Sequence, residues 1–402
     1  MTKSPNQGDA PNREIAYDPL HECLPSTRSL RSIASQVSRS LILSLVRPLE
    51  PRPMKDVVLV TGASGYVAGH CILLLLSNGY KVRGTLRSLR RADEVRQWLT
   101  KARREIDPGE DLSFAEAELT DARSWGAAME GVRYVLHVAS PIPSSMPKNP
   151  DDLIVPAREG TLNVMRAASR ASVQRVVQTS SLSAIFHGCD DPNSHLFTEA
   201  DWTDPDHKDN VPYTRSKAIA ERAAWAELPK LPRPLEWVAI NPGMVLGPVL
   251  DKDSSASVQL VVKLLKGEIP GLPRFGYPIV DVRDLVDLEL RAMTAPQAAG
   301  QRYIGSGPFI PLSDIAHVLK DRLGDKAKKV PTRKLPDWLV RFVGLFDKEV
   351  KGQLFELGKV RRPSSAKAEK ELGWTPRPWE ETIIDTARSL EAVGALSPMP
   401  QV

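Results

Sequence analysis

From Lys55 onward, short apolar runs alternate with longer stretches in which apolar residues recur every three or four positions. The short runs are rich in β-branched residues and predict strands, and the longer stretches predict amphipathic helices. The runs contain few polar residues, which is typical of strands buried on both faces of a parallel sheet. The alternation therefore predicts an α/β fold with a doubly wound, Rossmann-type parallel sheet. The predicted strands are residues 57–61, 81–86, 112–117, 132–138, 175–179 and 236–240, and the predicted helices between them are residues 66–77, 92–104, 121–130, 152–169 and 213–227.

The pattern loosens after Pro242, where Pro and Gly interrupt residues 243–278. Two short apolar pieces, residues 279–281 and 302–304, are predicted to be strands that return to the sheet. We therefore expect residues 54–241 to form the main domain. Residues 242–402 would form a smaller lobe interwoven with it, with returns to the sheet at about 279–293 and 302–306. The helices predicted in this lobe are residues 257–266, 282–293, 312–323, 335–343 and 365–372.

Residues 1–53 differ from the rest of the chain. They are rich in Ser, Arg and Pro, carry seven basic and five acidic side chains, and lack a sustained apolar face, which predicts a disordered extension. Their apolar run at residues 41–46 is too short to span a bilayer, and the early acidic residues Asp9 and Glu14 argue against a transit peptide. We expect a cytoplasmic protein without a membrane span. Organelle targeting by this extension and a true start at Met54 are the alternatives.

Composition excludes several kinds of site. The 402-residue chain is 42% hydrophobic and 26% charged, which is typical of a globular protein, and its net charge is +5. The basic residues form no long tract and do not alternate with aromatic residues, so we expect no nucleic-acid partner. Cys23, Cys71 and Cys189 form no CxxC pair, which favours a reducing compartment. The histidines show no HxxxH or HExxH spacing, so we expect no metal site.

A glycine-containing turn follows the first predicted strand. Gly62 allows the chain to turn tightly, and Gly65 allows the backbone to approach a phosphate without a Cβ atom in the way. The helix that follows points its free N–H groups and the positive end of its dipole at the same place. Strand, turn and helix together predict a dinucleotide pyrophosphate site. The residues predicted to bind there are Gly62, Ser64, Gly65, Tyr66 and Val67.

The end of the second predicted strand distinguishes NADP from NAD. An NAD site usually has Asp or Glu about twenty residues beyond the glycines, where the carboxylate accepts hydrogen bonds from the ribose 2′-OH. Here residues 84–91 contain no carboxylate but include Arg87 and Arg91. A guanidinium can bind a 2′-phosphate through two hydrogen bonds, whereas a carboxylate would repel it. We therefore predict NADP(H) as the cofactor, with Arg87 as the first choice for the phosphate and Arg91 as the second.

Tyr213 and Lys217 lie four residues apart at the start of a predicted helix, so both side chains project from one face. A phenol is a weak acid at neutral pH, and a fixed ammonium group strengthens it by favouring the phenolate. Lys217 can also hydrogen-bond the nicotinamide ribose. Upstream, the fifth strand leads into Ser180 and Ser181, at the edge where open α/β sheets place ligand-binding groups. A hydroxyl there can donate to a carbonyl oxygen as negative charge develops on it.

Together these motifs resemble the extended short-chain dehydrogenase/reductase family, and within it the dihydroflavonol reductase-like branch of aldehyde, ketone and methylglyoxal-type reductases. They keep the family's order and cover nearly everything from Met54 to about residue 390. The resemblance implies an NADP-binding Rossmann domain at 54–241 and a substrate-binding lobe at 242–402. The resembling stretches are VTGASGYVAGH (60–70), GTLRS (84–88), AELTD (117–121), YVLHVASP (134–141), RVVQTSS (175–181), YTRSKAIAERAAW (213–225), INPGMVLGP (240–248) and VDVRDL (280–285).

The resemblance also implies roles for single residues. Ser181 would bind the substrate oxygen, Tyr213 would protonate it, and Lys217 would make the phenol more acidic. One departure is Glu159, because many relatives have Asn before the Gly-Thr pair; whether Glu159 replaces an Asn-based proton relay stays open. The extension at 1–53 has no counterpart in the family pattern. The residues implied to line the cofactor are Glu118 and Leu119 beside the adenine, Ala139 near the ribose, and Asn241, Pro242 and Gly243 along the nicotinamide.

The predicted function is reduction of a small aldehyde or ketone to the alcohol, or the reverse oxidation, with NADP(H). One alternative is a nucleotide-sugar epimerase or dehydratase that retains NAD, against which Arg87 counts. Another is a non-catalytic NADP(H)-sensing regulator, which would not need Tyr213 and Lys217 together. Loops at 141–145, 185–189 and 243–278 are predicted to form the substrate pocket. The sequence does not distinguish a monomer from a homodimer.

Overall fold

The computed structural model describes residues 55–102, 109–141, 147, 149–207, 210–252 and 255–396, apart from the side chains of Lys348 and Glu349. They belong to one compact unit. The predicted extension at 1–53, Met54, residues 103 and 104 of the second predicted helix and most of the predicted pocket loop at 141–145 lie outside the described residues. Within those described, no helix is long and apolar enough to cross a membrane.

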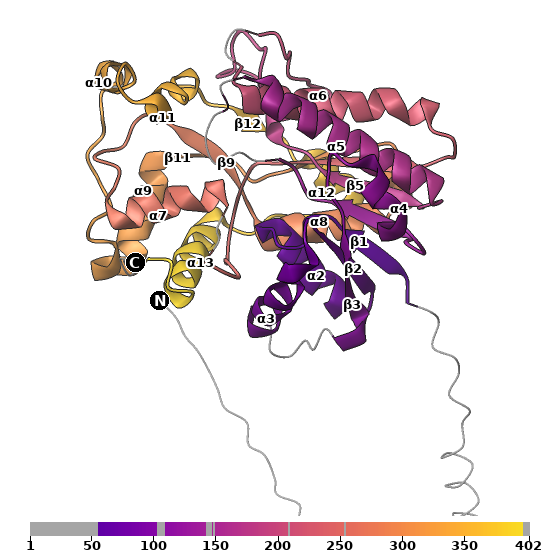
Figure 1. Ribbon diagram of the computed structural model, residues 1–402. Helices are drawn as coiled ribbons and strands as arrows, with labels where there is room; N and C mark the ends of the chain where they lie inside the picture. The colour runs from indigo at the N-terminus through magenta and orange to yellow at the C-terminus, as the bar shows by residue number, and fades with distance from the viewer. Residues whose placement is uncertain are drawn as a thin grey trace, which may run out of the picture. The chain divides into compact units, whose positions relative to one another are not determined.

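A parallel sheet of seven strands forms the centre of this unit (Figure 1). The strands are β1 (Val57–Val60), β2 (Lys81–Leu86), β3 (Leu112–Glu116), β4 (Tyr134–His137), β5 (Arg175–Thr179), β7 (Glu236–Pro242) and β10 (Arg302–Gly305). Their order is β10-β7-β5-β4-β1-β2-β3, so the direction of the crossovers reverses between β1 and β4. Ligands bind outside the carboxyl ends of the strands at such a reversal. The predicted doubly wound α/β fold is confirmed.

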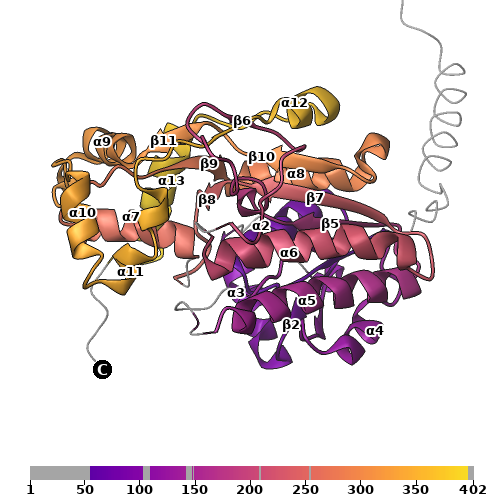
Figure 2. The same cartoon turned by 90° about the horizontal axis from the view of Figure 1, so that it is seen from above.

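Helices cover both faces of this sheet because side chains alternate along each strand. The helices are α2 (Tyr66–Ser77), α3 (Ala92–Ala102), α4 (Trp125–Ala128), α5 (Asp151–Arg170), α6 (Pro212–Glu227) and α8 (Val282–Thr294). Val58 and Val60 pack into an apolar cluster with α2, α3 and α8, whereas Leu59 between them packs with α4, α5 and α6. Figure 2 shows α5 and α6 on one side of the sheet and α8 on the other.

The C-terminal lobe is built on a second sheet of three strands, ordered β11-β9-β8. Its strands are β8 (Met244–Leu246), β9 (Gly276–Asp281) and β11 (Phe309–Pro311), and the helices packed on it are α7 (Ala256–Lys266), α9 (Leu312–Leu323) and α13 (Trp379–Ala392). The remaining elements include α10 (Asp337–Val343), α11 (Lys348–Lys351), α12 (Ala366–Leu372) and the paired strands β6 (Leu196–Phe197) and β12 (Arg362–Pro363).

The expectation that residues 279–281 return to the main sheet is wrong. β9 pairs in parallel with β8 and antiparallel with β11, and β10 occupies the main-sheet edge beside β7. Only the half-buried Gly243 separates β8 from β7, which ends at the buried Pro242. A Cβ atom on Gly243 would lie 2.5 Å from the carbonyl oxygen of Pro278, so glycine allows β9 to come this close. Since the edge beside β7 is taken, β9 extends β8 instead.

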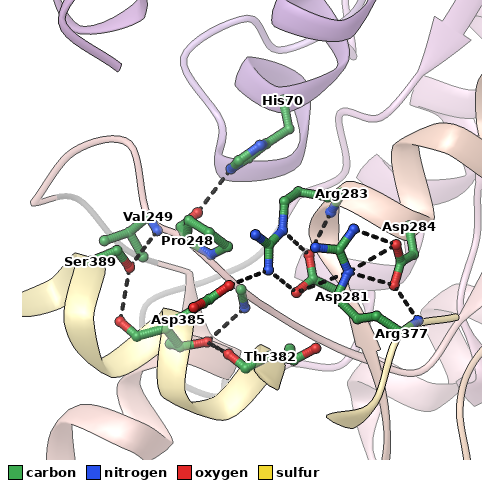
Figure 3. Close-up of polar contacts among 12 residues, drawn as sticks. His70, Pro248, Val249, Asp281, Arg283, Asp284, Arg377, Thr382, Asp385 and Ser389 are labelled. Carbon is green, nitrogen blue, oxygen red and sulfur yellow. Dashed lines mark hydrogen bonds and ion pairs between the residues drawn. The ribbon is translucent and has the colours of Figure 1, made fainter. Parts of the chain in front are cut away.

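A cluster of five charged residues joins α8 to the C-terminal segment (Figure 3). The Asp281 carboxylate caps α8 by accepting from the N–H of Arg283 at 2.8 Å, and the Arg283 guanidinium bridges Asp281 to Asp385 on α13. Arg377 donates to both carboxylate oxygens of Asp284. Burial alone would raise the pKa of Asp281, but hydrogen bonds from Arg283 outweigh it and hold that pKa below its usual value. We call these five residues the junction cluster.

Candidate active site

The glycine turn between β1 and α2 is tightly closed. Gly62 has a φ of +68°, a conformation that favours glycine, and its N–H donates to the Thr85 hydroxyl at 3.0 Å. The N–H of Gly65 donates to the carbonyl of Gly62 at 2.8 Å. A Cβ atom on Gly62 would lie 3.0 Å from that of Ala139, so the turn closely approaches the chain beyond β4. α2 begins directly after the exposed Gly65, where its first N–H groups can bind an anion. The other predicted turn residues, Ser64 and Val67, are half-buried.

Thr61 and His137 connect the ends of β1 and β4. The Thr61 hydroxyl accepts a hydrogen bond from the N–H of Ala139 at 2.9 Å and lies 3.1 Å from Nδ1 of His137. Burial, together with the nearby charge of Lys217, lowers the pKa of His137 to about 3. The imidazole is therefore neutral at physiological pH and ties the two strand ends together without adding charge to the site.

α6 carries Tyr213 and Lys217 on one face. Pro212 is the first residue of the helix, where the missing N–H of proline costs nothing, so Tyr213 lies in the first turn. The Lys217 ammonium lies 5.9 Å from the centroid of the Tyr213 ring and donates to the Ser140 hydroxyl at 3.0 Å, beyond β4. Lys217 is buried, while Tyr213 is half-buried. The structure thus brings phenol and ammonium together at the carboxyl end of β4.

The two serines after β5 lie in different surroundings. Ser180 is buried, and its hydroxyl donates to the carboxylate of Glu221 at 2.5 Å. Ser181 is half-buried, and its oxygen accepts a hydrogen bond from the N–H of Ser183 at 3.1 Å. Because this bond uses the oxygen of Ser181 as an acceptor, its hydroxyl proton can still be donated to a ligand. The proton of Ser180 is already committed.

A cavity of about 10 Å³ lies at the carboxyl ends of β4 and β5, beside Lys217. It is large enough for one water molecule. Its polar lining includes Lys217, His137, Gln178 and Ser140, and Oε1 of Gln178 is buried with no hydrogen-bond partner among the described residues. Residues at the carboxyl ends of β4 and β5 and the Lys217 side chain thus line one small cavity.

The two arginines predicted to bind a 2′-phosphate differ in what they contact. Arg87 is exposed beyond the end of β2 and forms no ion pair with a carboxylate in the part of the chain that the structure describes. Arg91 donates through Nε to Glu94 at 2.9 Å, one turn further along. Since Glu94 already engages the fork of Arg91, Arg87 is better placed to receive an anion.

Tyr66 and Asn241, predicted to line the cofactor, direct their side chains elsewhere. The Tyr66 phenol packs into the apolar cluster of the lobe and stacks edge-on against His70 at 5.6 Å. Burial raises its pKa well above the usual value. Asn241 is fully buried and donates through Nδ2 to the carbonyl of Ser181 at 3.1 Å and to Glu221 at 2.7 Å. The hydroxyl of Tyr66 and Oδ1 of Asn241 are buried without a hydrogen-bond partner among the described residues, and the contact of these two residues with a dinucleotide stays a prediction.

Three further positions lie around the end of β3 and on α5. Glu118 is exposed, and its backbone carbonyl is fixed by Trp125 Nε1 at 3.1 Å. Leu119 is half-buried and lines the cavity beside Lys217, as Ala139 does. Glu159 accepts from the neighbouring Arg158 at 2.8 Å and is not among the residues that line this cavity. The Glu159 carboxylate is thus held by a salt bridge on α5.

Sequence reasoning missed Glu221. This fully buried carboxylate lies one helical turn beyond Lys217 and binds Ser180, Asn241 and Arg302. The signal was present, because Glu221 follows Lys217 by the same four residues that separate Tyr213 from Lys217. That spacing places all three side chains on one face of α6.

Comparison with known proteins bears on what such a site does. Residues 58–304 match the model of the NAD dependent epimerase/dehydratase family. The chain belongs to this family. Cinnamoyl-CoA reductase 1 of Petunia hybrida is 32% identical to it over 351 residues, which cover 86% of this chain and 95% of that protein. Tetraketide alpha-pyrone reductase 2 of Arabidopsis thaliana is 32% identical over 270 residues, which cover 66% of this chain and 82% of that protein.

Solved structures agree with this assignment. This chain is similar to the structure of yeast methylglyoxal/isovaleraldehyde reductase Gre2 complexed with NADPH, with a TM-score of 0.69 and 27% sequence identity. The match covers 84% of this chain and 99% of the Gre2 chain. The predicted family is therefore confirmed: the protein is an extended short-chain dehydrogenase/reductase of the dihydroflavonol reductase-like branch. It is an NAD(P)-dependent oxidoreductase that acts on carbonyl or alcohol groups, as the sequence predicted.

Proposed function

We propose that the protein reduces a small aldehyde or ketone to the alcohol with NADPH, and that Tyr213 is the proton donor. The observation that carries this proposal is the pairing of the Tyr213 phenol with the buried Lys217 ammonium on one face of α6. Both groups lie at the carboxyl edge of the sheet, next to the turn in which Gly62 approaches Ala139 without a Cβ atom. This turn, the start of α2 and the exposed Arg87 fit a dinucleotide with a 2′-phosphate. Bound NADPH supplies the hydride.

The residues of the chain supply the proton and stabilise the charge. The substrate carbonyl oxygen accepts hydrogen bonds from the hydroxyls of Tyr213 and Ser181. As hydride reaches the carbonyl carbon, negative charge develops on the oxygen, and Tyr213 transfers its proton there. The Lys217 ammonium stabilises the resulting phenolate, while Ser181 stabilises the oxyanion through its donated hydrogen bond. In the reverse direction the phenolate accepts the proton of the alcohol.

The choice of NADPH over NADH rests on Arg87. Arg87→Asp removes a guanidinium that has no carboxylate partner among the described residues and introduces a charge that repels a phosphate. A hydrogen bond to a charged group contributes about 1.5–3 kcal/mol, so we expect the KM for NADPH to rise roughly tenfold to a hundredfold. The KM for NADH should fall or stay the same. Arg91→Ala is the matched control, and an unchanged preference in Arg87→Asp would contradict the assignment.

The relatives named as cinnamoyl-CoA reductases favour an aromatic acyl thioester as a second substrate class. The same residues serve this chemistry, because hydride adds to the thioester carbonyl and the oxygen again needs Tyr213 and Ser181. The adduct then loses the thiol and becomes an aldehyde. The two substrate classes give different products. An aldehyde gives an alcohol, whereas a thioester gives an aldehyde and a free thiol.

One assay tests the proposal. The purified protein is mixed with NADPH and a panel of aldehydes, ketones, cinnamoyl-CoA and UDP-sugars while the absorbance of NADPH is followed. We expect carbonyl-dependent oxidation of NADPH that falls about 10²–10⁴-fold in Tyr213→Phe, the range of general acid catalysis. Activity retained in Tyr213→Phe would overturn the role of the phenol. Tight NADPH binding without turnover would indicate a sensor, and conversion of a UDP-sugar without net NADPH loss an epimerase.

A further inference from the structure

The face of α6 that carries the proposed catalytic pair continues with Glu221, which has no exposed surface. Both of its carboxylate oxygens are occupied. Oε2 accepts from the Ser180 hydroxyl at 2.5 Å and from Nδ2 of Asn241 at 2.7 Å, and Oε1 accepts from Nε of Arg302 at 2.6 Å. One buried carboxylate therefore connects α6 to the ends of β5 and β7 and to β10.

These contacts hold Ser181 as well as Ser180. Nδ2 of Asn241 donates not only to Glu221 but also to the backbone carbonyl of Ser181 at 3.1 Å. Glu221 thus binds the side chain of Ser180 directly and the backbone of Ser181 through one amide. The loop that carries Ser181 is therefore held through Ser180 and through the Ser181 carbonyl. Both links lead to Glu221, which lies on α6 together with Tyr213.

The countercharge of Glu221 is itself held in place. Arg302 is 8% exposed and donates through one terminal nitrogen to the carbonyls of Glu199 at 2.7 Å and Asp201 at 2.8 Å. Its guanidinium lies 3.6 Å from the centroid of the Trp202 ring, a cation–π contact. A buried charge is tolerated when it is paired and hydrogen-bonded, and Glu221 and the two carbonyls satisfy Nε and one terminal nitrogen of Arg302. The other terminal nitrogen is buried without a hydrogen-bond partner among the described residues. Arg302 thus anchors Glu221 to the segment that contains Glu199 and Asp201.

We propose that Glu221 is a positioning residue that sets the distance between Ser181 and Tyr213, so that both hydroxyls reach the same substrate oxygen. This inference rests on the proposed function, which gives Ser181 and Tyr213 their roles. The two hydroxyls come from separate segments, and Glu221 joins these segments behind the site. A misplacement of about 1 Å at a reacting group can cost roughly a hundredfold in rate. The role is therefore measurable without any contact between Glu221 and the substrate.

A double-mutant cycle tests this role. Glu221→Gln keeps the size of the side chain, but its amide nitrogen must face Arg302 or the Ser180 side, where it donates instead of accepting. We expect kcat/KM to fall about 10–100-fold with the Kd for NADPH unchanged. If Glu221 acts through Ser181, then Ser181→Ala/Glu221→Gln should be no more than about threefold worse than Ser181→Ala. If the two single losses in kcat/KM multiply in the double variant, the positioning role of Glu221 is overturned. The proposed reductase function would not be affected by that result.

The matched control is Asp284→Asn in the junction cluster. Asp284 is also buried and bound to an arginine, Arg377, but it touches neither serine. It should lower the Tm while kcat/KM stays within about twofold of the wild type. If Glu221→Gln does not fold, Asn241→Ala removes the link to Ser181 and keeps the ion pair with Arg302. The same non-additivity with Ser181→Ala is expected.

A crystal structure of Glu221→Gln gives a readout that does not depend on turnover. We expect Ser181 to move relative to Tyr213 by more than about 0.5 Å, the tolerance of a catalytic arrangement. Ser181 unmoved would overturn the positioning role even if the wild type reduced none of the compounds tested. If Ser181 moves in Glu221→Gln but the wild type reduces none of the compounds, only the proposed function is refuted.

Discussion

Two fully buried glutamates bind hydroxyls at the carboxyl end of β5: Glu221 binds Ser180, and Glu289 binds Thr179. Their helices, α6 and α8, lie on opposite sides of the main sheet (Figure 2). Glu221 on α6 is paired with the guanidinium of Arg302 at 2.6 Å. Glu289 on α8 accepts hydrogen bonds from the Thr179 hydroxyl at 2.5 Å and the Cys71 thiol at 3.2 Å, and no cation is bound to it among the described residues. The same side chain, equally buried, thus occurs with and without a countercharge.

The difference shows that the partner, not burial alone, decides what a buried carboxylate does. Burial raises the pKa of Glu289 to about 7, and the hydrogen bonds from Thr179 and Cys71 offset only part of this effect. Glu289 therefore changes its charge near neutral pH. Glu221 has a permanent countercharge that is itself anchored to backbone carbonyls. We infer that the α6 side holds a fixed geometry and that the α8 side responds to pH.

Removing the countercharge should have the largest effect. Arg302→Met leaves Glu221 buried and unpaired, so we expect the free energy of unfolding to fall by about 3–5 kcal/mol. Urea denaturation monitored by tryptophan fluorescence measures this change.

The matching test removes the carboxylate as well. In Glu221→Gln/Arg302→Met no unpaired charge remains, so the double variant should be more stable than Arg302→Met alone. A double variant that is less stable than Arg302→Met would show that the loss comes from packing around Arg302 rather than from the unpaired charge.

The pH response of Glu289 should be the next largest effect. The native pKa of about 7 lies above the ordinary value of 4.5, so the native state binds more protons than the unfolded chain between these values. The free energy of unfolding should therefore fall as pH rises from about 4.5 through about 7, by about 3 kcal/mol in total. Glu289→Gln stays neutral and should remove this slope. Histidines also titrate between roughly pH 5 and 8, and the comparison with the variant cancels their contribution. Stability curves that run parallel for wild type and variant over this range would contradict the raised pKa of Glu289.

The main sheet was predictable because its physics is local. β2 (KVRGTL) and β5 (RVVQT) begin and end as the sequence predicts, since each is a short stretch with β-branched residues that comes soon after a predicted helix. α13 was missed although Ile383, Ala387 and Leu390 recur at helical spacing in Trp379–Ala392 and pack in the lobe; the helix follows directly after Pro376 and Pro378, which interrupt the pattern. The partner of β9 was also missed, because it depends on which sheet edge β10 leaves open.

The site shows the same division between local and non-local features. Tyr213 and Lys217 were found because four-residue spacing on a helix fixes their shared face. The direction of the Asn241 side chain could not be read from its neighbours, because its partners Ser181 and Glu221 come from distant parts of the sequence. Such contacts depend on tertiary packing, which brings β5, β7 and α6 together.

The smallest effect is expected two residues from Glu289, on the solvent side of α8. Asp287 accepts from Arg291 Nε at 2.7 Å, and the side chains are 40% and 44% exposed. Asp287→Asn should lower the free energy of unfolding by no more than about 0.5 kcal/mol, because water screens an exposed pair and Arg291 keeps its bonds to the carbonyls of Leu372 and Gly373. Thermal unfolding at low and high salt measures this loss, which should shrink further as salt rises. A loss above about 1 kcal/mol would mean that exposure does not control the strength of ion pairs in this helix, and the larger effect expected for Arg302 would then need another cause.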